Sequence, residues 1–360
     1  MSKYSDLKQI EKKVLNSERL SFEDGISLYN SDEIFTIGRL ANIIRERKNG
    51  NKVYFITNLH INYTNICVNR CDFCAFSRDH DDKDAYTLTP EQIVNIAKEK
   101  LPNGATEIHI VGGLHPDLKI EYYLEFLSKL KNLYPHIHLQ ALTAVEIEHI
   151  ASVSGLTVKE TLIRLKDAGL GSLPGGGAEI FSDRIRKKLC PKKISGSQWL
   201  NVLRTAHNLG IRSNATMLYG HIETVEERLD HLIQLRNLQD ETKGFMSFIP
   251  LSFHPENTKL KHLNNPGGLL DLKTIAISRL ILDNFDHIKS FWIMLGLKLA
   301  QLSLSFGADD IDGTVVEEQI THSAGAKTPQ TVTRSELIDL IQEAGRMPTE
   351  RDTLYNNIKQ

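Results

Sequence analysis

Three of the four cysteines in this 360-residue chain, Cys67, Cys71 and Cys74, lie within eight consecutive positions. Random placement produces this spacing with a chance on the order of 10⁻⁴, so the cluster indicates a shared role. An odd trio this close together does not fit a disulfide framework. Three thiolates on one short segment can bind a single soft metal centre. Cys190 stands alone, and we interpret it as a small buried residue.

Two kinds of metal centre are compatible with three cysteines. Zinc in a closed site takes four protein ligands, for which His60 and His80 are nearby candidates. A [4Fe–4S] cluster held by three cysteines leaves one iron open to bind a small molecule and pass it an electron. In the alternative without metal, the same spacing places the three cysteines on one face of a helix as small apolar side chains. Asparagines and an aspartate interrupt the segment, so we expect a metal-binding loop instead.

The cysteines follow a candidate strand, and beyond it short β-branched or aromatic runs alternate with segments of helical period. This alternation is typical of a parallel α/β fold. Eight strand–helix units predict a (β/α)8 barrel of the TIM type. The expected strands are Tyr54–Asn62, Glu107–Val111, His136–Thr143, Gly171–Leu173, Ser213–Leu218, Met246–Leu251, His287–Ile293 and Asp309–Asp312. The expected helices are Pro90–Lys100, Glu121–Leu133, Val158–Ala168, Gln198–Leu209, Val225–Gln239, Leu272–Asn284, Gly296–Phe306 and Arg334–Ala344.

An N-terminal helical extension precedes the barrel. Leu7, Ile10, Val14 and Leu15 form one apolar stripe at helical spacing. We therefore expect a helical layer over residues 1–51 and a barrel with C-terminal helices over residues 52–360.

The charge balance argues against polyanion binding. The 43 Lys and Arg nearly cancel the 45 Asp and Glu, for a formal net charge of -2, so nothing favours a nucleic acid or an anionic membrane. The N-terminus has no apolar core segment, and no run approaches the ~20 apolar residues of a membrane span. We expect a soluble, cytoplasmic protein.

A barrel of this kind carries its active site at the carboxyl ends of its strands. His221 and His254 follow expected strands, and we predict roles in substrate binding or proton transfer for them. Arg78 follows the cysteine loop and is a candidate partner for a substrate carboxylate, with a surface salt bridge as the alternative.

The CxxxCxΦC motif, with Phe73 at Φ after the first strand of an α/β barrel, resembles the radical S-adenosylmethionine (SAM) superfamily. The resemblance implies that Cys67, Cys71 and Cys74 bind a [4Fe–4S] cluster whose free iron binds the amino and carboxylate groups of SAM. It also implies that an electron from the cluster splits the sulfonium into methionine and a 5'-deoxyadenosyl radical.

The resemblance implies further contacts with SAM. Gly112 and Gly113 would contact its amino group, Glu146 its ribose hydroxyls and Phe73 its adenine. Without SAM, Gly112 and Gly113 would only form a tight turn. Glu146 would be a solvated carboxylate at the start of a helix, and Phe73 would pack within its loop. Three glycines before Glu179 resemble a phosphate-binding turn, but we expect close backbone approach to cofactor or substrate, with Glu179 a polar contact.

Much of the chain resembles the aminofutalosine synthase family of the futalosine route to menaquinone. That family's activity would be addition of the 5'-deoxyadenosyl radical to 3-[(1-carboxyvinyl)oxy]benzoate, with rearrangement and decarboxylation to 6-amino-6-deoxyfutalosine. SAM is then a consumed co-substrate, and flavodoxin or ferredoxin is the kind of electron donor implied. The segments that carry the resemblance are Asn62–Cys67, Cys74–Arg78, Ile110–Pro116, Thr143–Glu146, Pro174–Glu179, Asn214–His221, Phe253–Asn257, Asp309–Thr314 and Gly345–Tyr355.

Other interpretations stay open at this point. Dehypoxanthine futalosine cyclase and the FO synthase half are related radical SAM enzymes that start by hydrogen abstraction. A non-catalytic metal-binding module and a barrel enzyme with structural cysteines are the alternatives from other classes.

Overall fold

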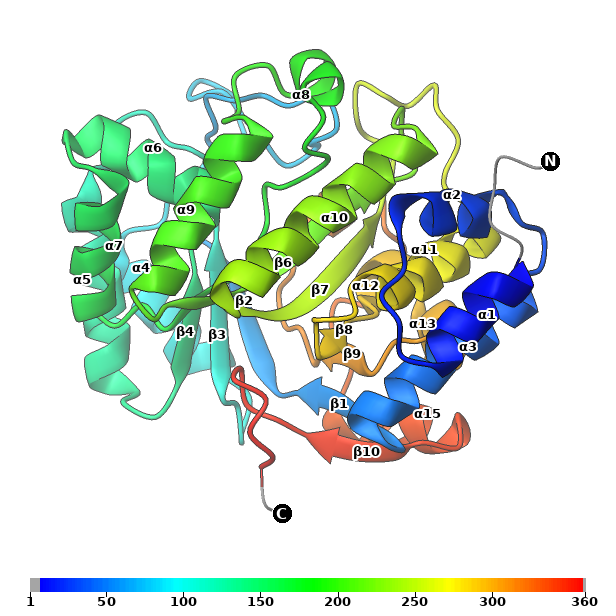
Figure 1. The fold of residues 1–360 in the computed structure, drawn as a ribbon. Coiled ribbons are helices and arrows are strands. Elements are labelled where there is room, and N and C mark those ends of the chain that lie inside the picture. The colour runs from blue at the N-terminus through cyan, green and yellow to red at the C-terminus, as the bar shows by residue number, and fades with distance from the viewer. Residues whose placement is uncertain (1–6, 359–360) are drawn as a thin grey trace.

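The computed structural model describes residues 7–358, so residues 1–6 of the expected helical layer lie outside the described part. Seven parallel strands form one sheet in chain order, as expected for a TIM-type barrel (Figure 1). They are β2 (Asn58–Asn62), β3 (Glu107–Val111), β4 (His138–Ala141), β5 (Ser172–Leu173), β6 (Arg212–Tyr219), β7 (Phe245–Ser252) and β8 (His287–Ile288).

A second sheet lies beneath the barrel, in the order β10–β1–β9. Its strands are β1 (Lys52–Ile56), β9 (Asp310–Gly313) and β10 (Met347–Glu350), paired in parallel. Isolated bridges join Lys289 to Asp310 and Leu59 to Val316, so the segment from β9 onward spans the gap between β8 and β2. The barrel architecture is therefore confirmed, although its hydrogen-bonded ladder is not continuous.

The expected strand Tyr54–Asn62 is two strands, and the prediction of one was wrong. The break falls at Thr57, whose hydroxyl donates to Glu350 Oε1 at 2.7 Å. The next residue turns to another partner, since the Asn58 backbone N–H donates to Thr314 Oγ1 at 3.1 Å. Both pieces are extended and buried, so local periodicity carries no sign of the change of sheet.

The expected strand His287–Ile293 is also too long. Pairing with β7 stops at Ile288, and Trp292–Leu295 forms the short helix α12. The Trp292 indole donates to the Gly313 carbonyl at 2.9 Å, which turns the chain across the end of β9.

The helices agree with the expected pattern in most places. For α4, Thr89 accepts a hydrogen bond from the Gln92 N–H and Pro90 occupies the first turn, as its sequence predicts. The helices are α1 (Leu7–Leu15), α2 (Phe22–Asn30), α3 (Ile34–Asn49), α4 (Pro90–Lys100), α5 (Ile120–Leu133), α6 (Ala144–Ser154), α7 (Val158–Asp167), α8 (Asp183–Leu189), α9 (Gly196–Asn208), α10 (Val225–Thr242), α11 (Gly268–Ile281), α12 (Trp292–Leu295), α13 (Leu297–Ser303), α14 (Ile320–Ser323) and α15 (Arg334–Glu343).

The helices α1–α3 pack on one side of the barrel, with α2 against α10 and α3 against α11 (Figure 1). Close contact of α3 depends on Gly38, since a Cβ there would lie 2.5 Å from the Phe306 ring. Across residues 7–358, no helix combines the length and apolar composition needed to cross a membrane.

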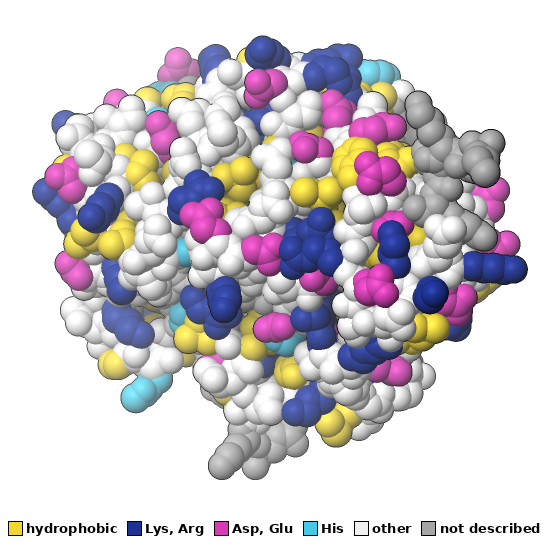
Figure 2. Space-filling model, in the orientation of Figure 1, with side chains coloured by type: hydrophobic (Ala, Val, Ile, Leu, Met, Phe, Trp, Pro, Cys, Tyr) yellow, Lys and Arg dark blue, Asp and Glu magenta, His cyan; other side chains and the backbone are white. Residues whose placement is uncertain are grey.

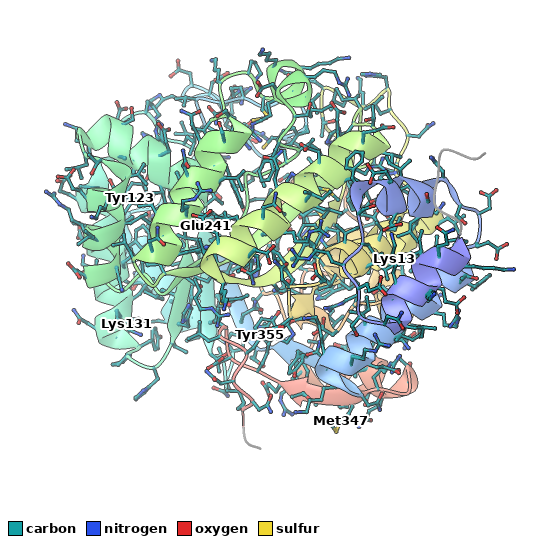
Figure 3. All side chains as sticks on the ribbon, viewed as in Figure 1. Lys13, Tyr123, Lys131, Glu241, Met347 and Tyr355 are labelled. Carbon is teal, nitrogen blue, oxygen red and sulfur yellow. The ribbon has the colours of Figure 1, made fainter. Side chains whose placement is uncertain are left out.

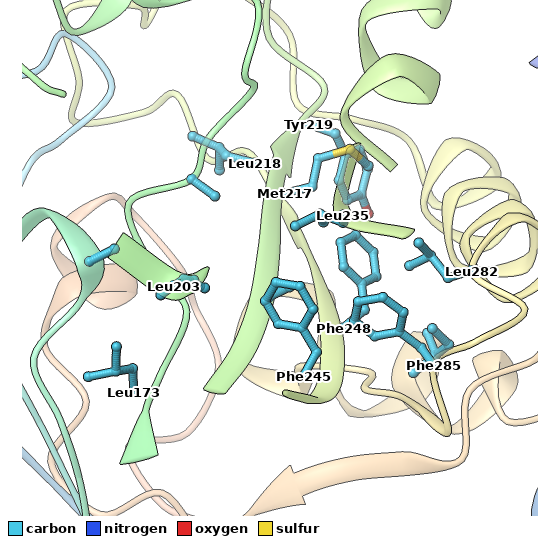
Figure 4. Packing of buried hydrophobic residues seen from close by; sticks show 14 of the residues in the cluster. Leu173, Leu203, Met217, Leu218, Tyr219, Leu235, Phe245, Phe248, Leu282 and Phe285 are labelled. Atoms are coloured by element: carbon cyan, nitrogen blue, oxygen red, sulfur yellow. The ribbon is translucent and has the colours of Figure 1, made fainter. Parts of the chain in front are cut away.

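Aromatic side chains fill the core around β7, as Figure 4 shows. The rings of Phe245 and Phe285 stack with centroids 5.2 Å apart, and the ring of Phe248 meets Phe285 nearly edge-on at 6.4 Å. Burial of each such side chain stabilises the fold by about 1.5–3 kcal/mol. Phe245 begins β7 and Phe285 precedes β8, so this core fixes the amino ends of these two strands.

Candidate active site

A cavity of about 330 Å³ opens at the carboxyl ends of the strands. The residues around it come from loops far apart in the sequence, as a barrel predicts. Nine of the eleven site residues expected from the sequence line it: Cys67, Cys71, Phe73, Cys74, Gly112, Gly113, Glu146, Glu179 and His254.

The cysteine segment is a loop, as expected, and backbone hydrogen bonds hold it in place. The Cys67 N–H donates to the Arg78 carbonyl at 3.1 Å, and the Arg78 N–H donates to the Asn65 carbonyl at 2.7 Å. The Val68 N–H donates to Leu114 at 3.0 Å, which ties the loop to the segment after β3. These backbone hydrogen bonds therefore fix the position of the loop that carries the three thiols.

All three thiols are free and line the same cavity, with Cys71 buried and the other two half-buried. Among residues 7–358, no three His, Cys, Asp or Glu side chains converge closely enough to hold one metal ion. His60 stacks on His109, and the exposed His80 bonds Asp81, so neither completes a zinc site. Three soft donors spread around one end of a cavity fit a multi-iron cluster better than a single ion.

A second segment, residues 189–193, lies against the cysteine loop. The Asp72 N–H donates to the Leu189 carbonyl at 2.9 Å. Cys190 is buried, as interpreted from the sequence, but it also neighbours Cys71. A hydrogen bond with Cys190, together with burial, raises the pKa of the Cys71 thiol. Nothing in the local sequence marks Cys190 as a neighbour of the cysteine trio.

Lys193 is the functional candidate that sequence reasoning missed. Its ammonium lies 2.6 Å from Glu179 Oε1 and 5.1 Å from the centre of the Phe73 ring. Both side chains of the ion pair are only 11% exposed. At the Cys71 thiol the two charges act in opposite directions, because Lys193 lowers its pKa and Glu179 raises it.

Glu146 is buried in the cavity wall, and both of its carboxylate oxygens accept hydrogen bonds. Its Oε1 accepts hydrogen bonds from the Tyr63 hydroxyl at 2.8 Å and the Gly112 N–H at 3.1 Å. Its Oε2 accepts from the Thr143 N–H at 2.7 Å, which begins α6. Burial raises the pKa of the Glu146 carboxyl. The carboxylate thus joins the loops that follow β3 and β4.

Gly112 and Gly113 allow the loop after β3 to approach the cysteine loop. A Cβ on Gly112 would lie 2.8 Å from the Tyr63 ring. A Cβ on Gly113 would lie 2.2 Å from the Ile66 carbonyl oxygen. Both glycines therefore let the loop after β3 pack directly against the segment that carries the cysteines.

His221 and Arg78 lie outside the cavity. The His221 ring pairs with the Leu218 carbonyl at 3.0 Å, while Arg78 bonds Asp84 at 2.7 Å. His254 is in the cavity wall, where its ring nitrogen contacts the Met294 carbonyl at 3.0 Å. Of these three candidates, the geometry brings only His254 to the site.

The inner end of the cavity is polar, which the sequence reasoning also missed. His60 and His109 stack with ring centroids 4.4 Å apart, and burial lowers the pKa of both rings. Lys289 pairs with Asp312 at 2.8 Å beside them. The sequence does contain a pattern that predicts this polar end. Polar residues occupy alternate positions of β2 and β3, and alternate residues of a barrel strand face the interior.

Two family models match the chain. Residues 61–235 match the radical SAM superfamily, and residues 242–360 match the CofH/MqnC C-terminal region. Among solved structures, the fold is similar to methylornithine synthase, with a TM-score of 0.74 over 94% of this chain and 97% of that one, at 19% identity.

Curated relatives match over nearly the whole chain. An aminodeoxyfutalosine synthase from Thermus thermophilus is 49% identical over 97% of this chain and 95% of its own length. One from Streptomyces coelicolor is 44% identical over 98% and 94%. A 5-amino-6-(D-ribitylamino)uracil–L-tyrosine 4-hydroxyphenyl transferase from Methanopyrus kandleri is 42% identical over 90% and 89%.

Proposed function

The chain belongs to the radical SAM superfamily, whose enzymes use a [4Fe–4S] cluster and SAM, and on this basis we propose that it is an aminodeoxyfutalosine synthase. The proposed reaction joins the 5'-deoxyadenosyl group of SAM to the vinyl carbon of 3-[(1-carboxyvinyl)oxy]benzoate. Rearrangement and loss of a carboxylate then give 6-amino-6-deoxyfutalosine.

The observation that carries this proposal is the 49% identity to the Thermus thermophilus synthase over 97% of the chain. The tyrosine transferase of Methanopyrus kandleri, at 42%, supports a second candidate, an FO-synthase-like reaction on tyrosine. Both reactions need an enclosed cavity beside the cysteine loop, so the fold alone does not separate them.

Cys67, Cys71 and Cys74 are the proposed ligands of the cluster. When bound and reduced, the cluster supplies the electron that splits SAM into methionine and the 5'-deoxyadenosyl radical. We propose that Gly112 and Gly113 contact the amino group of SAM and that Phe73 lies against its adenine. Glu146 already accepts three hydrogen bonds from the protein, so any contact with the ribose adds to them.

The remaining cavity residues would hold the substrate and exclude water. We propose that His254 contacts the substrate, whereas His221 and Arg78 are left out because their side chains lie outside the cavity. A fixed cavity favours reaction by holding the vinyl group against C5' of the adenosyl group.

An acidic one-electron carrier such as flavodoxin or ferredoxin is the proposed electron donor. Lys187, Lys188 and Lys192 are exposed, and Lys192 Nζ donates to the Val68 carbonyl of the cysteine loop at 3.3 Å. Figure 2 shows Lys and Arg side chains along the upper edge of the molecule, where α8 lies in Figure 1. Reversing these lysine charges should raise KM for an acidic carrier while leaving dithionite-driven turnover unchanged.

The reaction is tested by mass spectrometry of anaerobic mixtures containing reconstituted protein, SAM and dithionite. One mixture contains 3-[(1-carboxyvinyl)oxy]benzoate, and a parallel one contains L-tyrosine with 5-amino-6-(D-ribitylamino)uracil. Aminofutalosine with methionine and little 5'-deoxyadenosine is the expected result. If the benzoate substrate is unchanged and product forms only from tyrosine, the proposed reaction is wrong and the FO-synthase-like reaction is supported.

A further inference from the structure

The ion pair between Lys193 and Glu179 is the most deeply enclosed pair of opposite charges beside the cysteine loop among residues 7–358. The ammonium lies over Phe73, which stands between Cys71 and Cys74 in the sequence. Its own segment is tied to the loop by the hydrogen bond from Asp72 to Leu189. Lys193 therefore lies close to any cluster that these cysteines bind.

We propose that the buried ammonium of Lys193 raises the reduction potential of the cluster and that Glu179 holds this charge in place and limits its effect. The proposal concerns the cluster alone and goes beyond the reaction proposed above.

The effect of Lys193 on the cluster is electrostatic. A [4Fe–4S]²⁺ core with three thiolates carries a net charge of about −1, and one electron from an external one-electron donor takes it to about −2. A nearby positive charge stabilises the more negative state, and its effect grows when water is excluded. Since Lys193 and Glu179 are almost buried, solvent screens them weakly.

The two charges act with opposite sign, which makes the proposal specific. The carboxylate of Glu179 opposes electron uptake, whereas the ammonium of Lys193 favours it and lies 5.1 Å from the centre of the Phe73 ring within the cysteine loop. Removing Lys193 should therefore lower the potential, and neutralising Glu179 should raise it. A purely structural role for the pair predicts no such opposition.

The experiment is an electron-paramagnetic-resonance redox titration of the anaerobically reconstituted protein without substrate or SAM. It compares wild type with Lys193→Met, Glu179→Gln and the charge-preserving Lys193→Arg. Lys159→Met is the control, because Lys159 is an exposed lysine on α7 with no part in the cysteine loop or the proposed donor surface. Iron and sulfide content confirm cluster loading in each variant.

For Lys193→Met we expect the ratio of reduced to oxidised cluster at the wild-type midpoint to fall about tenfold, equal to about 59 mV for a one-electron couple. Glu179→Gln should shift the midpoint upward, while Lys193→Arg and Lys159→Met should leave it near wild type.

An unchanged midpoint in loaded Lys193→Met, or shifts of the same sign in Lys193→Met and Glu179→Gln, would overturn the proposal. If Lys193→Met fails to load the cluster, the test rests on the midpoint potential of Glu179→Gln. An unchanged or lowered midpoint in that variant would contradict the proposal. No substrate is involved, so failure of the proposed reaction leaves this test intact.

Discussion

The two ends of the barrel use charged and nucleophilic side chains in opposite ways. At the cavity end, three free thiols line an open space. At the base, Arg351 pairs with Asp310 at 2.6 Å and Arg279 pairs with Asp309, with all four side chains nearly or fully buried. Tyr355, labelled in Figure 3, has its ring centre 4.2 Å from the Arg351 guanidinium and stacks on His287 with ring centroids 3.6 Å apart. Groups that partner each other hold the fold, whereas groups facing a cavity are available to a cofactor.

The largest effect should come from removing a thiol at the cavity end. Cys67→Ala, Cys71→Ala and Cys74→Ala should each reduce product formation to background, because a three-cysteine site has no spare ligand. Iron content and activity would both be measured on each purified variant. Cys190→Ala is the control and should retain the cluster, since Cys190 does not line the cavity. Full activity of the three variants would show that the cysteines are structural.

A smaller but global effect should follow from breaking a pair at the base. Arg351→Met leaves Asp310 buried without its partner and should cost roughly 3–5 kcal/mol of unfolding free energy. Chemical denaturation would measure this loss, and cluster content per folded molecule should not change. The double variant Arg351→Met with Asp310→Asn should recover part of the loss. A stability equal to wild type in Arg351→Met would remove the distinction drawn between the two ends.

Tyr63→Phe tests a side chain that has a buried hydrogen-bond partner, like the groups at the base, and whose partner Glu146 lines the cavity. It removes the hydroxyl that donates to Glu146 at 2.8 Å and should destabilise the protein by about 1–3 kcal/mol. It should also raise KM for SAM, because Glu146 holds the loop that carries Gly112. Tyr122→Phe is a matched control, since its hydroxyl donates to the Leu88 carbonyl away from the cavity. Equal changes in KM for the two variants would argue against a link between Glu146 and SAM.

The smallest effect should be a pH dependence at the cavity rim. A hydrogen bond with Glu318 raises the pKa of His322 to about 9 from an ordinary value of 6.5. The raised pKa means that this contact stabilises the fold fully below pH 6.5 and that its contribution is lost as the pH rises through 9. The difference in Tm between wild type and His322→Gln should thus be largest near pH 6 and vanish by pH 10. A difference that persists at pH 10 would point to packing instead.

The sequence predicts the cavity end better than it predicts the base. The cysteine spacing is a local pattern, and the capping residues of α4 and the strand-end glycines are local as well. Lys193 carries no local mark that separates it from Lys192, because only tertiary contact buries it. The split of Tyr54–Asn62 and the pairing of Lys52 with Met347 depend on contacts across most of the chain. Periodicity over a short window contains no information about such partners.

The position of β1 between β9 and β10 has a consequence for biosynthesis. A chain emerging from a ribosome makes β1 early, but its partners appear only when residues 310–313 and 347–350 have been translated. At roughly 5–20 residues per second, β1 waits on the order of tens of seconds with both edges unpaired. The unpaired N–H and C=O groups of such an edge can pair with an extended segment of another chain, which leads to aggregation. Nascent molecules stalled before Met347 are therefore expected to need a chaperone, whereas a fully translated chain closes its own edge.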